Sequence, residues 1–390
     1  MALSSFAQNA PSPVQATDRQ SSPAPAPPVT LIPRSHEERE RRYDAEHHVI
    51  LNAFVSDASG KPVRGLKQED FTLLDNGQPQ MPASFRQVKG NMGIAPVRVV
   101  LMLDAVNNSP REIANDRKGV EQFLRRGPPQ LDYETSIALL SGSGVIFGRP
   151  SRDRDDLIGA LQTLTKSARL FDCAGEGGGS EQVFATFNVQ GGTNVAEGQH
   201  PDEKSGCLNL RFLQSVSALK NFATGQQDVP GRVILIWIGR GWPLLSVREF
   251  RPDTAALRQN FFDNLVTLSN AMREAQVTLD AVFSPDLFRT IELRTDRDNT
   301  FFNGIPNEDE VAASSLGLQV LAHQSGGLIL TESKDLAEEI AVCIADAESY
   351  YVLSFDSPPA ARPGELHSIR VKMNRPGLTA RTNTAYYAQP

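Results

Sequence analysis

The sequence has few cysteines, no long apolar run and no excess of positive charge. Its 390 residues include three cysteines, too few for a fold that depends on disulfides in place of a hydrophobic core. No stretch approaches the roughly 18 consecutive apolar residues that a membrane-spanning helix needs. The formal net charge is −7, which argues against non-specific binding to nucleic acids or anionic membranes, because both require a basic surface. The length predicts two or three domains held by ordinary cores.

Motifs of the common enzyme classes are also missing. Gly60-Lys61 is followed by proline and cannot form a phosphate loop, and residues 239–242 lack the third glycine of a dinucleotide fingerprint. Gly142-Ser143-Gly144 lacks the spacing of a nucleophile elbow. We therefore expect a protein that is not an enzyme. An unrecognised hydrolase that uses acidic residues of a long loop is the alternative.

The first 44 residues differ in composition from the rest of the chain. Proline, alanine, serine and glutamine dominate residues 1–34 without a hydrophobic period, which predicts a disordered tail because so little apolar area can be buried. A linker dense in both charge signs follows. Residues 2–10 resemble a shortened export signal without its basic region. With the proline-rich spacer behind them, they lead us to expect export to the periplasm or the cell exterior.

Strand patterns occur at both ends of the remaining chain. Residues 49–55 alternate between apolar and other side chains, Asn76-Gly77 favours a tight hairpin, and residues 369–373 alternate again. Each end offers about three strands, and neither set alone makes a stable core. We predict that residues 45–95 and 348–390 form one split β-sandwich. Two separate β flaps packed on the middle of the chain are the rival interpretation.

Residues 96–347 alternate between strand and helix patterns. The apolar runs at 98–104 and 233–238 are typical of strands buried on both faces, and residues 257–272 carry an apolar stripe with helical spacing. Further helices are predicted at 111–126, 152–166 and 308–323. The alternation predicts an α/β fold, a doubly wound and mostly parallel sheet with helices on both faces. Ligands of such sheets bind beyond the carboxyl ends of the strands, which singles out Asp104, the loop after Ile238 and residues 284–286.

The order of these patterns resembles the von Willebrand factor A domain. The resemblance rests on RVVLMLD at 98–104 with a turn and a helix behind it, on the hairpin at 136–147 and on VILIWIGRG at 233–241. The segment 51–80 (LNAFVSDASGKPVRGLKQEDFTLLDNGQPQ), together with SYYVLSF and IRVKMNRPGLTAR near the end, resembles the VWFA-related family common in Acidobacteria. Over residues 45–390 the resemblance implies the fold, whereas the roles of that family are mostly undefined.

The resemblance also implies a metal-ion-dependent adhesion site. In A domains, Asp-x-Ser-x-Ser, a later Thr and a later Asp hold a divalent cation through hard oxygen ligands. Here Asp104 keeps the acid, but Val106 and Asn108 replace the two serines. Ser109 and Thr193 are the remaining candidate ligands, so the resemblance implies a degraded site.

The loop behind the second apolar run strengthens this expectation. Ile238-Gly239-Arg240 replaces the final Thr-Asp-Gly of the A domain. Arg240 is always charged, and we expect it to pair with Asp104 in place of a metal, so that Mg²⁺ binds weakly or not at all and no cofactor is needed. In the alternative, Asp104 and Asn107 only tie the loop and cap the first helix.

The most economical interpretation is an exported interaction or adhesion-type module. It would bind a protein or a surface polymer through loops at the carboxyl ends of the sheet, with neither nucleic acid nor a transmembrane segment involved. A structural envelope component without a specific ligand is a further alternative. The expected ligand-binding residues are Asp104, Asn107, Asn108, Ser109, Thr193, Arg240 and Trp242.

A loop at residues 172–207 has little periodicity, and loops of that length are usually functional or disordered. Cys173 and Cys207 lie at its ends. In an exported protein we expect them to form a disulfide, which would stabilise the fold by roughly 3–4 kcal/mol in the chain-entropy treatment. Two free thiols are the alternative. Cys343 falls on an apolar helical stripe and is predicted to be a core residue.

Overall fold

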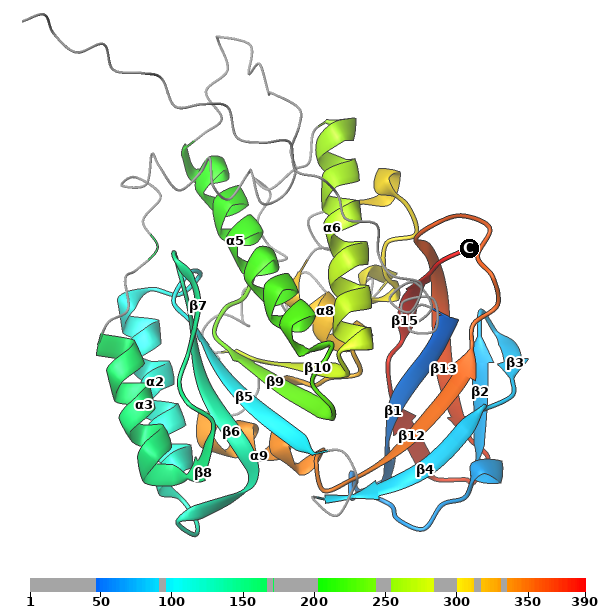
Figure 1. Cartoon of the computed structure of the whole chain (residues 1–390), viewed down its shortest axis with the longest axis horizontal. Coiled ribbons are helices and arrows are strands. Elements are labelled where there is room, and N and C mark those ends of the chain that lie inside the picture. Colours follow the sequence, from blue (N-terminus) through cyan, green and yellow to red (C-terminus); the bar gives the residue numbers. More distant parts are fainter. Residues whose placement is uncertain are drawn as a thin grey trace, which may run out of the picture. The chain divides into compact units, whose positions relative to one another are not determined.

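The computed structural model describes residues 47–90, 96–166, 171, 203–242, 254–283, 300–311, 317–330 and 335–390. These residues all belong to the second of two units, which covers residues 41–390. The predicted tail at 1–44 and nearly all of the loop at 172–207 lie outside the described residues. Figure 1 shows the described elements with their labels.

A mostly parallel sheet forms the middle of the chain (Figure 1). Its strand order is β11-β10-β9-β5-β6-β7, and only β7 runs antiparallel along this path. When the six strands of this path are numbered 1 to 6 along the chain, their order across the sheet from β7 to β11 is 3-2-1-4-5-6. This is the order of a doubly wound sheet. The short β8 (Ser151–Asp153) pairs with β6 off this path. The other strands span Val97–Asp104 (β5), Gln130–Ser141 (β6), Gly144–Phe147 (β7), Arg232–Ile238 (β9), Val277–Val282 (β10) and Ile329–Leu330 (β11).

Helices cover both faces of this sheet because its strands are apolar on both sides. In β9 the side chains of Val233, Leu235 and Trp237 join one buried cluster, while the alternate residues join another. The first cluster includes α5 (Glu203–Gln226), α6 (Ala255–Glu274) and α8 (Leu318–Gln324). The second includes α2 (Pro110–Arg125), α3 (Arg154–Lys166) and α9 (Leu336–Ala345).

The helix predicted over residues 308–323 is wrong. The structure has a short 3-10 helix, η4 (Glu308–Glu310), and the separate α8. Val311 ends η4 with extended backbone, and Gly317 precedes α8 with extended backbone as well. The apolar spacing across this region therefore belongs to two short elements.

Strands from the two ends of the described chain form two antiparallel four-stranded sheets. β1 pairs with β12 from His48↔Asp356 to Ala53↔Tyr351, and β2 pairs with β13. One sheet has the order β14-β1-β12-β4 and the other β15-β13-β2-β3, and apolar residues of both pack in a common core. The strands span His48–Asp57 (β1), Phe71–Asp75 (β2), Gln78–Gln80 (β3), Ser84–Lys89 (β4), Ser349–Asp356 (β12), Glu365–Met373 (β13), Leu378–Arg381 (β14) and Ala385–Ala388 (β15).

Buried contacts join these antiparallel sheets to the α/β part. The guanidinium of Arg232, on β9, lies 4.5 Å from the ring centre of Phe54 and 4.9 Å from that of Tyr350. At the other end of the contact, Tyr387 packs edge-on against Phe262 and donates its hydroxyl to the backbone oxygen of Ile305. The two parts therefore share buried side chains.

Candidate functional site

The order of the parallel sheet reverses between β5 and β9. At such a point the connections leave in opposite directions, and the crevice beyond the carboxyl ends of the two strands is where doubly wound sheets bind ligands. Asp104 is the last residue of β5, and Gly239 directly follows β9. The structure thus places the predicted residues of both loops at one location.

Asp104 is 1% exposed, and both of its carboxylate oxygens accept hydrogen bonds. Oδ1 accepts from the backbone N–H groups of Val106 at 3.0 Å and Asn107 at 2.9 Å. Oδ2 accepts from the side-chain amide of Asn107 at 2.8 Å and from the indole N–H of Trp237 at 3.2 Å. A carboxylate has about four lone-pair sites, and all four are used here.

Two opposing influences act on the ionisation of Asp104. Burial raises the pKa of this carboxyl group, whereas its hydrogen bonds with Asn107, Trp237 and Val106 favour the charged form and lower the pKa. Burial is the larger influence, so the pKa of Asp104 lies above its ordinary value.

Ser109 begins α2 as its N-cap. Its hydroxyl oxygen accepts from the backbone N–H of Glu112, and its own N–H donates to the Glu112 carboxylate at 2.8 Å. This reciprocal capping box satisfies two backbone donors that the first helical turn leaves open. The hydroxyl that the resemblance offers as a metal ligand therefore caps a helix in the structure.

Asn108 connects α2 to the loop after β9. Its amide nitrogen donates to Oδ2 of Asp116 at 2.6 Å, and its oxygen accepts from the backbone N–H of Arg240 at 2.9 Å. Gly239 makes this approach possible: its φ is +135°, and a Cβ there would lie 2.7 Å from the Asn108 amide nitrogen. Burial, with the charges of Asp104 and Glu112, raises the pKa of Asp116 to about 7.

Arg240 does not pair with Asp104 as the sequence led us to expect. Its Nε lies 2.8 Å from Oε1 of Glu112, and its side chain is 37% exposed. Asp104 is already enclosed by uncharged donors, so the guanidinium lies at the rim beside the helix cap. Burial raises the pKa of Glu112, but its hydrogen bonds with Ser109 and the charge of Arg240 outweigh this and hold the pKa below its usual value.

A second guanidinium lies in the same region. Arg211, on α5, interacts electrostatically with both Asp104 and Arg240, and its group lies 5.8 Å from the ring centre of Phe171. Burial lowers the pKa of Arg211, and the charge of Asp104 opposes that shift. Beside a buried carboxylate the site therefore carries two cationic side chains, Arg211 and Arg240.

Trp242 lies in the core, 3% exposed. Its ring centre is 5.0 Å from that of Trp237 and 6.4 Å from that of Phe212. In this structure its side chain packs beneath the site and offers no open surface to a partner. Thr193 and Cys173 lie outside the described residues, so the threonine loop and the bridge to Cys207 stay predictions.

The described donor set does not fit a Mg²⁺ ion. The carboxylate of Asp104 is fully hydrogen-bonded, Asn107 and Asn108 turn amide N–H groups toward carboxylates, and Val106 has no side-chain oxygen. Mg²⁺ requires near-octahedral oxygen ligands and gives up its waters reluctantly. Across the described ranges, no group of three or more histidine, cysteine, aspartate or glutamate side chains is arranged to hold a metal ion.

Sequence reasoning missed four members of the site: Arg211, Trp237, Glu112 and Asp116. Trp237 lies within an apolar run and has the pattern of a core residue, although its N–H binds Asp104. Glu112 and Asp116 are four residues apart on one helix face, and Ser109 with Glu112 forms the serine-x-x-glutamate signature of a capping box. That signature, visible in the sequence, was the signal that Glu112 lies at the helix start.

Comparisons with known proteins place few limits on this chain. It matches no protein-family profile and no curated protein. Among solved structures, proximal thread matrix protein 1 from the mussel byssus is 10% identical over 68% of this chain and 49% of its own, with a TM-score of 0.31. The human COPII-coat protein Sec24c is 9% identical over 80% and 48%, with a TM-score of 0.32. The manganese-loaded Plasmodium vivax TRAP protein is 10% identical over 77% and 96%, with a TM-score of 0.30.

The chain spans about half the length of the first two of these structures. At such TM-scores the likenesses carry no argument about fold or function. Within the described residues, every helix is too short or too polar to cross a lipid bilayer.

Proposed function

We propose that the chain is an exported interaction module of von Willebrand factor A type, inserted between strands of a β-sandwich, that recognises a partner carboxylate without a divalent cation. The strand order 3-2-1-4-5-6 with an antiparallel β7 supports the fold assignment, together with the resemblance in sequence. The partner is a protein or a surface polymer, and no catalytic step is part of the proposal.

The observation that carries this proposal is that Asp104 is enclosed by hydrogen bonds from the chain itself, whereas Arg240 is part-exposed. All four hydrogen bonds of Asp104 come from within the chain, so its role is to hold the two loops together. Arg240 is part-exposed and lies against Glu112 through its Nε side. No hydrogen bond between described residues uses its two terminal nitrogens, which can donate a bidentate pair to a carboxylate.

Capture of partners from the native envelope tests the proposal. The wild-type chain should retain the same proteins or polymers in buffer with Mg²⁺ and in buffer with EDTA. Arg240→Ala should lose them, and Arg240→Lys should lose most of them because an ammonium cannot form the bidentate pair. Lys118→Ala, an exposed position on the same helix α2, is the matched control and should bind as the wild type. Retention that disappears in EDTA would contradict the proposal.

One observation favours a hydrolase instead. The pKa of Asp116 is raised to about 7, and perturbed carboxyl groups are common in active sites. Yet Asp116 is 8% exposed and its Oδ2 is held by Asn108, and burial alone is the leading cause of the shift. Hydrolysis of general ester, phosphate or glycoside substrates that disappears in Asp116→Asn would favour the enzyme.

A further inference from the structure

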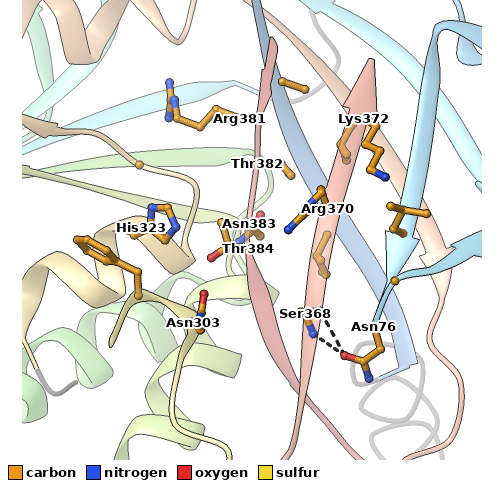
Figure 2. A pocket seen from close by; sticks show the side chains of 17 residues that line it. Asn76, Asn303, His323, Ser368, Arg370, Lys372, Arg381, Thr382, Asn383 and Thr384 are labelled. Carbon is orange, nitrogen blue, oxygen red and sulfur yellow. Dashed lines mark hydrogen bonds between the residues drawn. The ribbon is translucent and has the colours of Figure 1, made fainter. Parts of the chain in front are cut away.

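A pocket of about 820 Å³ lies where the antiparallel sheets meet the α/β part, away from the loops around Asp104. Figure 2 shows its walls: His323 and Asn303 on one side, residues 382–384 in the middle, and Arg370 and Lys372 of β13 on the other. The volume falls within the range of about 300–1,000 Å³ that is usual for small-molecule sites.

The charge of this pocket is positive. Arg370 and Lys372 are exposed on the outer face of β13, and within the described part of the chain neither forms an ion pair. The third cation, Arg381, is engaged, because it donates to the carboxylate of Asp346 and to the backbone oxygen of Gly326. All charged side chains in the lining are basic, although the chain as a whole carries a net charge of −7.

Two hydroxyl groups in the lining form no hydrogen bond with any residue that the structure describes. Thr382 is 5% exposed, and its Oγ1 has no hydrogen bond to any described residue. The Oγ1 of Thr384 is likewise buried and unpartnered within the described ranges. A buried polar atom without a partner costs about 1–3 kcal/mol, so such atoms are rare in folded proteins unless a ligand or water serves them.

The rest of the lining combines polar side chains with apolar ones, among them Leu74, Ile369 and Phe302. Asn76, Asn303, Ser368 and Asn383 contribute amide and hydroxyl groups. His323 lies with its ring centre 4.9 Å from that of Phe302, and burial lowers its pKa, so the ring is neutral near pH 7. A neutral imidazole beside amides and hydroxyls can exchange hydrogen bonds with the hydroxyl groups of a ligand.

Close backbone contacts hold the walls in place. Gly326 has φ +77°, and a Cβ there would lie 2.6 Å from the backbone carbon of Thr382. The backbone N–H of Thr384 donates to the oxygen of Gln324 at 3.2 Å. The connection between β14 and β15 is therefore fixed against the end of α8, and the unpartnered hydroxyls of Thr382 and Thr384 have a fixed position in the pocket.

We propose that this pocket binds a small acidic sugar, whose carboxylate, phosphate or sulfate group pairs with Arg370 and Lys372 while its hydroxyl groups bind the threonine, asparagine and histidine side chains opposite. Arg370 and Lys372 form no ion pair with a described residue, and no described acidic side chain lines the pocket, so the site selects an anion. The hydroxyl and amide groups of the lining offer hydrogen bonds that a hydroxylated ligand can use and an apolar one cannot, while the apolar side chains can pack against the C–H face of a sugar ring. The inference is independent of the partner site at Arg240.

Calorimetric titration of the full chain, with saturation-transfer NMR, tests this proposal. The probes are glucuronate, glucose 6-phosphate and glucose 6-sulfate, which separate the three acid groups, and glucose and inorganic phosphate as partial ligands. At least one acidic sugar should bind with a dissociation constant of about 1 mM or below. Glucose and inorganic phosphate should each bind at least tenfold more weakly than that sugar.

Variants locate the binding. Arg370→Ala with Lys372→Ala should weaken the binding of the acidic sugar at least tenfold, and Thr382→Val, which keeps the side-chain shape without the hydroxyl, should weaken it several-fold. Arg86→Ala with Lys61→Ala removes the same charge from exposed positions elsewhere and should leave binding unchanged.

Three results would overturn the proposal. One is an absence of binding by all three acidic sugars at 10 mM, on the order of the weakest small-ligand affinities. Another is acidic-sugar binding that stays unchanged when Arg370 and Lys372 are both replaced by alanine. The last is an affinity for inorganic phosphate as high as that for the acidic sugars. Loss of the Arg240-dependent partner would not bear on any of them, so the two proposals fail separately.

Discussion

Trp237 donates its indole N–H to Oδ2 of Asp104 at 3.2 Å and thereby ties β9 to β5 at the switch point of the sheet. The bond ends on a buried carboxylate, and hydrogen bonds to charged groups are worth more than neutral ones. The neighbouring Trp242, also buried, has an indole N–H without a hydrogen-bond partner among the described residues. The two tryptophans therefore provide a matched comparison.

Trp237→Phe should destabilise the protein more than Trp242→Phe. Both changes remove similar volume from one cluster, but only the first deprives Asp104 of a donor. We expect Trp237→Phe to lower the free energy of unfolding by about 2 kcal/mol beyond the effect of Trp242→Phe. Urea denaturation followed by circular dichroism measures both. Equal losses in the two variants would show that the bond to Asp104 contributes nothing measurable.

Asp116 should make stability depend on pH in an unusual direction. The pKa of Asp116 is about 7 in the folded protein and about 4 in an unfolded chain. Between these two pH values, Asp116 is therefore protonated to a larger extent in the folded protein than in the unfolded chain. The contribution of Asp116 to stability is thus complete below about pH 4 and is lost as the pH rises to 7.

Asp116→Asn removes this titration and keeps an oxygen that can accept from Asn108. The difference in unfolding free energy between the variant and the wild type should rise by up to about 1.4 kcal/mol per pH unit through the window. Asp155→Asn, an exposed position on α3, is the control and should run parallel to the wild type. If the unfolding free energy of Asp116→Asn changed with pH in the same way as that of the wild type, the result would contradict the raised pKa.

Much of the α/β architecture could be predicted from the sequence, because apolar periodicity reports burial directly. The run predicted at 98–104 is β5 (Val97–Asp104), and the one at 233–238 is β9 (Arg232–Ile238). The first residue of α3 was harder to predict. The helix predicted over 152–166 begins only at Arg154, because the strand β8 (Ser151–Asp153) occupies the first of these positions. Asp153 accepts from the backbone N–H groups of Asp155 and Asp156 in the first helical turn.

The chemistry of the site was harder to predict, because its bonds join residues far apart in the sequence. That Asp104 belongs to the switch point follows from its place at the end of a buried strand. That its partner is Trp237 and not Arg240 depends on the side to which each residue of β9 points and on the position of Glu112 one helical turn into α2. No local pattern distinguishes these two pairings.

Arg232 should be important for cooperative unfolding. It is fully buried and lies against Phe54 and Tyr350 of the antiparallel sheets while belonging to β9. Arg232→Lys keeps the charge but loses the planar group that lies over the rings, so we expect a loss of about 2 kcal/mol. The wild type should unfold in one urea transition and the variant in a broader or split one. Arg86→Lys, exposed on β4, should match the wild type, and two separate wild-type transitions would contradict the shared core.

The thiol count tests the predicted bridge between Cys173 and Cys207. Cys343 is completely buried, and burial raises the pKa of its thiol far above the usual value, so it should react with a thiol reagent only after unfolding. We expect no reactive thiols in the native protein and one under denaturing, non-reducing conditions. A count of three after denaturation would show that the bridge is not formed.

Divalent cations should bind weakly or not at all at Asp104. A metal would have to displace the N–H donors of Asn107 or Trp237 from a carboxylate that is 1% exposed, and the remaining hydroxyl, that of Ser109, caps α2. Two guanidinium groups, those of Arg211 and Arg240, add repulsion. Calorimetric titration with Mg²⁺ and Mn²⁺ should therefore show no stoichiometric site with a dissociation constant below about 1 mM. A site of that affinity which disappears in Asp104→Ala, while Asp155→Ala retains it, would restore metal-dependent adhesion, because the hydrogen bonds around Asp104 would then have to open when the ion enters.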